Sequence, residues 1–149
     1  FTGVEPAVAG KPARPLLDET VRRCGGRRPL MVGDRLDTDI EGAHAAEVDS
    51  LLVMTGVTGL AELVAAAPRA RPTYVSADLG GLAVAHEVPE DDGEVIAQGG
   101  WRARVEGGLL RVDGAGGADA WWRVVAVASW RHLDATGGPV ATDGIAPPG

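Results

Sequence analysis

Three aspartates in one short stretch have the side chains and the spacing to bind a cation. Asp34, Asp37 and Asp39 fall within six residues, directly after the apolar run 30–32 and Gly33. Carboxylates this close repel each other unless a positive charge joins them, and Mg²⁺ prefers oxygen ligands of this kind. Asp and Thr are also favoured at helix N-termini, where they cap the backbone and complement the dipole. The spacing alone therefore leaves a metal site and a capped helix open as alternatives.

The pattern around these aspartates predicts a strand that leads into a helix. The run 30–32 is apolar, Gly33 and Asp34 end it, and apolar residues then recur at helical spacing over about 36–46. A short apolar run of this kind is typical of a buried parallel strand. Because ligands bind beyond the carboxyl ends of such strands, Asp34 stands where a metal ligand is expected.

The first part of the chain alternates between strand and helix patterns. The further expected elements are strands at 7–9, 51–54 and 73–75, helices at 15–24 and 59–66, and a helical turn capped by Asp78. This alternation predicts an α/β fold with a doubly wound, Rossmann-like parallel sheet. Since such sheets usually have about five or six strands, we expect residues 1–82 to form the second half of one.

Composition limits the class of protein. The chain has 149 residues, 45% of them hydrophobic, and a net charge of −7. Lys11 is the only lysine, and the arginines at 22, 23, 27 and 28 fit a solvated helix end, so we expect no nucleic-acid partner. The single cysteine, Cys24, excludes an internal disulfide and is typical of a reducing compartment. Without a signal-peptide pattern or an apolar run of membrane-spanning length, we expect a cytoplasmic protein that binds no membrane; a homo-oligomer stays open.

Three segments, in this order, resemble those of a known enzyme family. They are Gly10-Lys11-Pro12, the stretch 33–39 (Gly-Asp-Arg-Leu-Asp-Thr-Asp) and the stretch 52–58 (Leu-Val-Met-Thr-Gly-Val-Thr). Together they resemble the C-terminal half of a haloacid dehalogenase (HAD) superfamily phosphatase. Within the superfamily they are similar to the capped class IIA phosphatases that act on p-nitrophenyl phosphate, phosphoglycolate and glycerol 3-phosphate. The resemblance covers about residues 1–82.

The resemblance implies a mechanism and a set of site residues. In the family a nucleophilic aspartate attacks the phosphate of a small phosphorylated metabolite, Mg²⁺ neutralises charge, and a lysine steadies the phosphoryl oxygens. Lys11 corresponds to that lysine, which contacts the substrate. Asp34 corresponds to a Mg²⁺ ligand of the family. Asp39 corresponds to a catalytic residue that orients Lys11 or metal-bound water. Without the resemblance, a lone lysine before proline such as Lys11 is usually a surface loop residue, and a helix cap is the alternative for Asp39. The residues that correspond to the phosphate side of the pocket are Arg35, Leu36, Asp37 and Thr38.

The chain departs from the family pattern in two places. Neither the DxDxT motif, which supplies the nucleophile and the general acid, nor the inserted cap that selects substrate is found in the 149 residues. The chain also starts at Phe1 rather than Met, so we expect it to be part of a longer enzyme and to be inactive alone. Glu47 stands where the family pattern Ala-Ala-x-Val-Asp has glycine at a helix end, and a left-handed conformation there costs a non-glycine residue about 1 kcal/mol.

A second unit is predicted after residue 82. The acidic segment 83–98 is expected to be a linker, 99–134 a small α+β unit of one hairpin and one helix, and 135–149 a disordered tail. Its four tryptophans favour a compact core over a platform that stacks a ligand. The glycine-rich run 114–117 before the helix favours a flexible connection over a phosphate cradle, because Asp119 would repel an anion. The unit resembles the acetyltransferase-like appendage of some actinobacterial phosphatases, but the acyl-CoA pyrophosphate loop is missing and no acetyl transfer is expected.

Three classes of function stay open. The first is a Mg²⁺-dependent phosphomonoesterase with an aspartyl-phosphate mechanism, for which glycerol 3-phosphate is the first expected substrate because of the appendage. The second is another HAD phosphatase, acting on phosphoglycolate or a nucleotide. The third is a non-catalytic binding or regulatory module, if the chain is complete as given.

Overall fold

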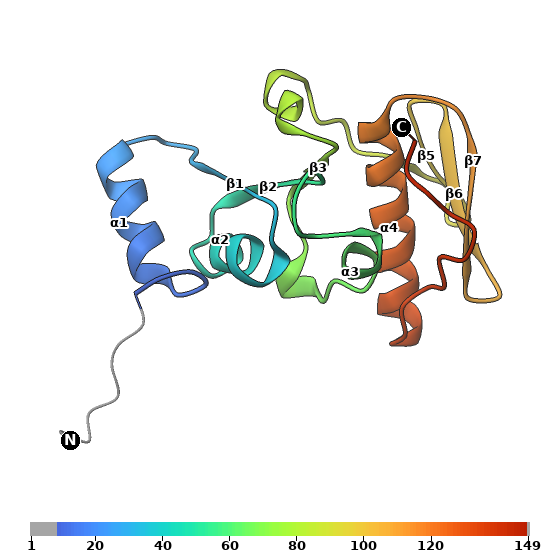
Figure 1. The fold of residues 1–149 in the computed structure, drawn as a ribbon, viewed down its shortest axis with the longest axis horizontal. Coiled ribbons are helices and arrows are strands. Elements are labelled where there is room, and N and C mark those ends of the chain that lie inside the picture. The colour runs from blue at the N-terminus through green and yellow to red at the C-terminus, as the bar shows by residue number, and fades with distance from the viewer. Residues whose placement is uncertain (1–8, 149) are drawn as a thin grey trace.

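A parallel sheet forms the first half of the structure, a computed structural model that describes residues 9–148 (Figure 1). Its strands are β1 (Leu30–Gly33), β2 (Asp49–Val53) and β3 (Tyr74–Ser76), in the order β1-β2-β3. All three run in the same direction, so their carboxyl ends meet at one edge of the sheet. The α/β class expected from the sequence is therefore confirmed. The expected strand 7–9 lies almost entirely outside the described residues.

Short helices connect and flank these strands. They are α1 (Arg14–Cys24), η1 (Leu36–Ile40), α2 (Glu41–Ala45), α3 (Leu60–Val64), η2 (Pro68–Ala70) and η3 (Leu79–Ala83). None of the residues of α1 is buried against the rest of the described chain. The outer edge of β1 likewise pairs with no other strand among residues 9–148. No helix in the described part of the chain has both the length and the apolar character needed to cross a membrane.

The helix expected over 36–46 is divided into two kinds of helical turn. It begins with the π-type turn η1, in which the carbonyl of Arg35 accepts the N–H groups of both Asp39 (3.1 Å) and Ile40 (3.2 Å). It then continues as the α-helix α2. Ile40 and Ala43 are fully buried, as the apolar spacing predicted, whereas Ala46 is only partly buried. Wide turns of this type are rare and are frequently found at functional sites.

An antiparallel sheet and a long helix form the second half. The strands β4 (Glu90–Asp91), β5 (Ile96–Gln98), β6 (Trp101–Glu106) and β7 (Leu109–Gly114) pair in chain order, and α4 (Ala118–Thr136) follows them. The predicted hairpin is present: Gly107 and Gly108 have φ angles of 58° and 80°, which a two-residue hairpin turn requires and glycine adopts without strain.

Two segments expected to be unstructured contribute to this second half. The segment 83–98, predicted to be a linker, contains β4 and β5, so the unit has a four-stranded sheet in place of a lone hairpin. The tail returns to the sheet: Leu110 donates its N–H to the carbonyl of Ala141 (2.9 Å), and Ala141 donates to Gly108 (2.8 Å). Val140 is buried beside them. The predicted disorder is therefore wrong for this part of the tail, whose order depends on a tertiary contact.

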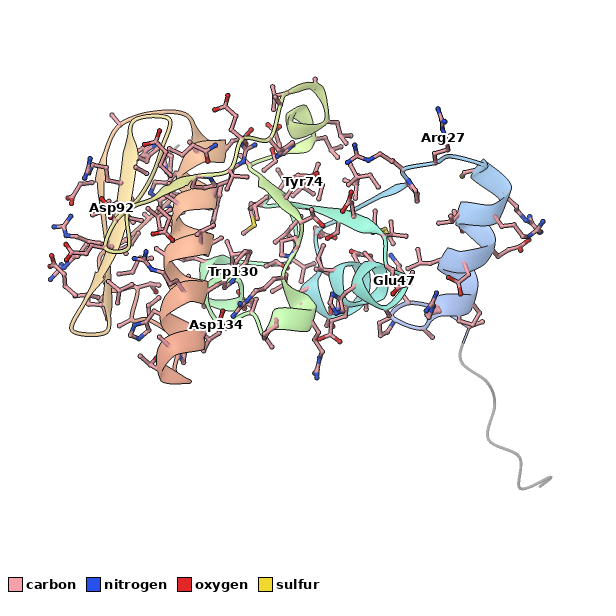
Figure 2. All side chains as sticks on the ribbon, turned by 180° about the vertical axis from the view of Figure 1, so that it is seen from behind. Arg27, Glu47, Tyr74, Asp92, Trp130 and Asp134 are labelled. Carbon is pink, nitrogen blue, oxygen red and sulfur yellow. The ribbon has the colours of Figure 1, made fainter. Side chains whose placement is uncertain are left out.

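The helix α4 lies between the two sheets (Figure 1). Trp121 and Trp122 are 2% and 7% exposed and belong to one hydrophobic core that includes residues from both halves. Trp130 donates its indole N–H to the carbonyl of Leu63 in α3 (2.8 Å). Figure 2 labels Trp130 on the side of α4 that faces the parallel sheet. The interpretation of the tryptophans as core residues is confirmed.

The glycine-rich run before α4 is packed against backbone. A Cβ on Gly116 would overlap the carbonyl oxygen of Gly99, and a Cβ on Gly114 would overlap that of Gly100. Ala115 donates its N–H to the carbonyl of Gly100 (3.3 Å). These glycines allow two loops of the second half to approach closely. Their role is therefore in packing, and the run forms neither a phosphate cradle nor a flexible connection.

Glu47 adopts the left-handed conformation, so of the two alternatives, a strained turn or a differently built one, the turn is the strained one. Its φ is 57°, its N–H bonds to the carbonyl of His44 (3.1 Å), and the N–H of Val48 bonds to that of Ala43 (2.9 Å). These two bonds make a Schellman turn, in which glycine is the preferred residue at the position of Glu47 (Figure 2).

Glu47→Gly is expected to stabilise the protein by about 1 kcal/mol, because it removes the steric cost of a Cβ in this conformation. The measurement is the free energy of unfolding from denaturant titration. The control is Ala45→Gly in the exposed last position of α2, which should destabilise by about 0.5–1 kcal/mol. Equal effects of both substitutions would contradict the strain at Glu47.

Candidate active site

Asp34 stands at the carboxyl end of β1 and is held by the loop that follows β2. Its Oδ2 accepts the N–H of Val57 (2.9 Å), and its main-chain carbonyl accepts the N–H of Thr58 (3.0 Å). A Cβ on Gly56 would overlap Oδ2 and lie 2.5 Å from the Cβ of Asp34, so only glycine fits there. The loop thus fixes one carboxylate oxygen of Asp34 and leaves Oδ1 without a hydrogen-bond partner among residues 9–148.

Asp39 joins Lys11 to the same strand end. Its side chain is buried, its Oδ1 accepts the Nζ of Lys11, and its Oδ2 accepts the N–H of Arg35 (3.2 Å). A Cβ on Gly33 would overlap the side chain of Asp39, which therefore lies directly against the end of β1. Lys11 comes from the loop before α1, yet this ion pair brings its ammonium group to β1. Its side chain remains 41% exposed, and an ammonium has three N–H donors, so it is available to a ligand.

Arg35 and Asp37 form an ion pair at the surface of the site. The Nε–H and Nη2–H groups of Arg35 donate hydrogen bonds to the two carboxylate oxygens of Asp37 (3.1 and 2.8 Å). This pairing lowers the pKa of the Asp37 carboxyl below its usual value and raises the pKa of Arg35. The residue before η1, Arg35, provides no side-chain cap, while Asp37 lies in the first turn of η1, where a carboxylate complements the helix dipole. A cavity of about 270 Å³ lies beside them, lined by Arg35, Leu36, Asp37, Val57, Thr58 and Glu62.

The three neighbouring aspartates have different partners and do not form one cation site. Asp37 pairs with Arg35 and Asp39 with Lys11, which leaves Asp34 as the carboxylate with an uncommitted oxygen. No group of three or more His, Cys, Asp or Glu side chains in the described part of the chain could hold a metal ion. Mg²⁺ usually keeps several waters and takes about one or two protein carboxylates, so Asp34 fits it as one ligand of an incomplete set.

Sequence reasoning identified the residues of β1 and η1 and assigned no role to the loop 54–58. Val57 and Thr58 form the backbone bonds to Asp34, and Gly56 gives that carboxylate its space. The position of this loop could have predicted its role. It follows the parallel strand next to β1, and the loops after neighbouring parallel strands meet at the carboxyl edge of the sheet.

The segment that contains the parallel sheet and the candidate site matches a family of hydrolases. The sequence profile of the HAD-hydrolase-like family matches residues 8–82, which is half of the chain. The chain therefore belongs to the HAD-hydrolase-like family.

Its relatives in sequence are phosphatases. The chain is 46% identical over 121 residues to D-glycerol 3-phosphate phosphatase of Mycobacterium tuberculosis, covering 79% of this chain and 32% of the relative. It is 37% identical over 87 residues to phosphoglycolate phosphatase 2 of Arabidopsis thaliana, covering 57% of this chain and 29% of the relative. The chain thus spans about a third of the length of these relatives.

Solved structures agree in fold. The crystal structure of glycerol phosphate phosphatase from M. tuberculosis in complex with magnesium has a TM-score of 0.67 at 43% identity, over 87% of this chain and 39% of that one. The same enzyme in complex with calcium gives 0.69 over 89% of this chain and 39% of that one. Both matches extend well beyond the family profile, so this enzyme shares the parallel sheet and at least part of residues 83–149.

Gly56→Ala is expected to destabilise the protein by about 1–3 kcal/mol, as overpacking in a well-packed site does. Rotation of the Asp34 carboxylate does not relieve the clash, because the Asp34 Cβ is itself 2.5 Å from the added methyl group. The measurement is the free energy of unfolding, with the Val57 amide followed by NMR. Gly26→Ala is the control, because nothing lies within 4 Å of its Cβ position; a loss of similar size there would show that the Asp34 contact is not the cause.

Proposed function

We propose that this chain is the C-terminal part of a Mg²⁺-dependent phosphomonoesterase that acts on small phosphorylated metabolites. The single observation that supports this most is the Lys11–Asp39 ion pair beside Asp34. The ion pair places the Lys11 ammonium, which can bind phosphate, at the same strand end as the Asp34 carboxylate, which can bind a metal. The two residues come from segments far apart in the sequence. A capped helix alone needs neither Lys11 nor a buried partner for it.

Each residue then has a physical role. Lys11 binds the phosphoryl oxygens as a point charge, and Asp39 holds the ammonium group in place. Asp34 offers Oδ1 to Mg²⁺ while Val57 holds Oδ2. When bound, Mg²⁺ supplies Lewis-acid stabilisation of the charge that develops on the phosphoryl group. The segment Arg35, Leu36, Asp37 and Thr38 forms the phosphate side of the pocket, where the carboxylate of Asp37 pairs with Arg35 and makes no direct contact with the phosphate.

The attacking group lies outside these 149 residues. We propose an aspartyl-phosphate mechanism, in which an aspartate of a DxDxT motif in the preceding part of the protein attacks phosphorus. The charges of this chain stabilise the transferred group and contribute no nucleophile.

Glycerol 3-phosphate is the proposed substrate. The M. tuberculosis relative named for it is similar over 121 residues, a length that extends into the second half of the chain. Phosphoglycolate is the second candidate, supported by the Arabidopsis relative. Comparing kcat/KM for the two compounds in the intact enzyme tests the assignment, and a higher value for phosphoglycolate would reverse it.

The chain of 149 residues is expected to show no phosphatase turnover alone, because Lys11 and Asp34 stabilise charge and cannot attack phosphorus. Joined to its N-terminal half, it should hydrolyse small phosphomonoesters, and chelation of Mg²⁺ with EDTA should abolish this activity. Phosphate release with and without Mg²⁺ is the measurement. Turnover by the 149-residue chain would contradict the proposal.

Substitutions at the site should separate the metal ligand from the phosphate-binding lysine. Asp34→Asn is expected to raise the Mg²⁺ concentration for half-maximal activity by at least about 10- to 100-fold, the loss typical of a residue that only supports a metal ligand, and excess Mg²⁺ should restore part of the rate. Lys11→Ala should lower kcat about 10²- to 10³-fold without rescue by metal, because its charge acts on the phosphoryl oxygens directly.

The matched control is Asp37→Asn in the intact enzyme. Its carboxylate pairs with Arg35 in solvent, so its loss should change kcat/KM by less than about threefold. Loss of turnover in Asp37→Asn together with normal Mg²⁺ dependence in Asp34→Asn would show that the metal ligand is assigned to the wrong residue.

A further inference from the structure

A carboxylate of α4 reaches the carboxyl end of β3. Asp119, in the first turn of α4, accepts at Oδ1 both the hydroxyl of Ser76 (2.9 Å) and the N–H of Ala77 (2.7 Å). Ser76 is completely buried, so its hydroxyl depends on Asp119 as its acceptor. Arg123, one turn further along α4, donates its Nε to the carbonyl of Val75 (3.0 Å). The start of α4 therefore holds the last residues of β3 and the first residue beyond it.

The end of β3 in turn holds the start of the loop 54–58. The carbonyl of Ser76 accepts the N–H of Met54 (3.0 Å), and Ser76 lies opposite Val53 in the parallel register. The Met54 side chain packs against the hydrophobic core that contains Trp121 of α4. Both the backbone and the side chain of Met54 are thus fixed by groups that depend on α4.

The far end of the same loop holds Asp34. Val57 and Thr58 donate their N–H groups to the carboxylate and the carbonyl of Asp34. Residues 55–57 are exposed, and the Val57 side chain is 65% exposed, so side-chain packing does little to fix the middle of the loop. Its position depends on its two anchored ends.

We infer that Asp119 is a positioning residue for the metal site. Through Ser76, Met54 and the loop 54–58, it keeps the Val57 N–H on Oδ2 of Asp34 and so directs Oδ1 toward the cation. This inference rests on the proposed function, since it takes Asp34 to be the Mg²⁺ ligand. It gives the second half of the chain a role: the appended helix sets the Mg²⁺ affinity of the phosphatase site.

The same helix supplies a matched control. Asp134, near the far end of α4, forms two hydrogen bonds with Arg71 (2.7 Å each) and also links α4 to the first half. Its partner Arg71 precedes β3, so this contact lies near the amino end of that strand and not at the carboxyl edge of the sheet. A role limited to docking α4 on the parallel sheet predicts similar effects for loss of Asp119 and of Asp134. A positioning role predicts different effects.

The experiment compares Asp119→Ala, Asp119→Asn and Asp134→Ala in the intact enzyme. Amide hydrogen exchange is measured at Met54, Val57 and Thr58 without metal, and Mg²⁺ is then titrated in the activity assay. Asp119→Ala should speed exchange at these amides roughly three- to tenfold, the equivalent of one net hydrogen bond. It should raise the half-saturating Mg²⁺ concentration by about three- to tenfold, less than loss of a residue that contacts a ligand directly.

Asp134→Ala should change neither quantity. Asp119→Asn keeps an acceptor oxygen but loses the charge that strengthens both hydrogen bonds, so it should change both quantities in the same direction as Asp119→Ala, by a smaller factor. Asp119→Asn also serves as the test variant if Asp119→Ala fails to fold. Equal exchange at Val57 in the Asp119 and Asp134 variants would overturn the inference. The inference would also be overturned if Asp119→Ala left the Mg²⁺ requirement unchanged while Asp34→Asn raised it. An unchanged requirement in Asp34→Asn itself contradicts the proposed function instead.

Discussion

The buried carboxylate of Asp39 is the constraint on which the site depends. A charge removed from water must be paired and hydrogen-bonded, and Asp39 is satisfied by Lys11 and by the N–H of Arg35. Its position requires glycine at 33, because any larger residue would occupy the same space. It also coincides with the wide turn of η1, in which the Arg35 carbonyl serves two successive N–H groups. The position of Lys11, the bond to the Arg35 N–H, the glycine at 33 and the wide turn of η1 are thus all linked to one carboxylate beside a strand end.

The two halves of the chain share a core, which distinguishes this structure from two domains joined by a linker. Buried residues from each of β2, α3 and β3 belong to the same hydrophobic cluster as Trp121, Val124 and Val125 of α4. Polar contacts at both ends of α4 supplement this apolar contact, through Asp119 at the start and Asp134 near the end. A helix held in this way transmits displacement of one half to the other, since packed interiors deform little.

Local patterns in the sequence were sufficient for the elements whose cause is local. The strands at 30–33 and 49–53, the Gly107–Gly108 hairpin and the left-handed Glu47 each follow from a few adjacent residues. Distant partners determined what was missed. The strand pairing of β4 and the order of Ala141 exist only because other strands lie beside them, and neither segment has an alternating pattern.

The same distinction applies to the candidate site. The sequence motifs marked Lys11, Asp34 and Asp39, although the partners of each aspartate were not apparent from spacing. Asp119 was interpreted as a residue that excludes an anion, whereas its carboxylate bonds to Ser76, 43 positions earlier. A side chain whose partner lies on another element carries no local signature, so sequence spacing could not assign it.

The outer edge of β1 has a consequence for handling this chain. Within the described residues that edge carries backbone N–H and C=O groups with no neighbouring strand, and Leu30 is 40% exposed. An open, apolar strand edge is a template on which another chain can add a strand. The 149-residue chain is therefore prone to self-association through this edge, and the associated fraction rises with protein concentration.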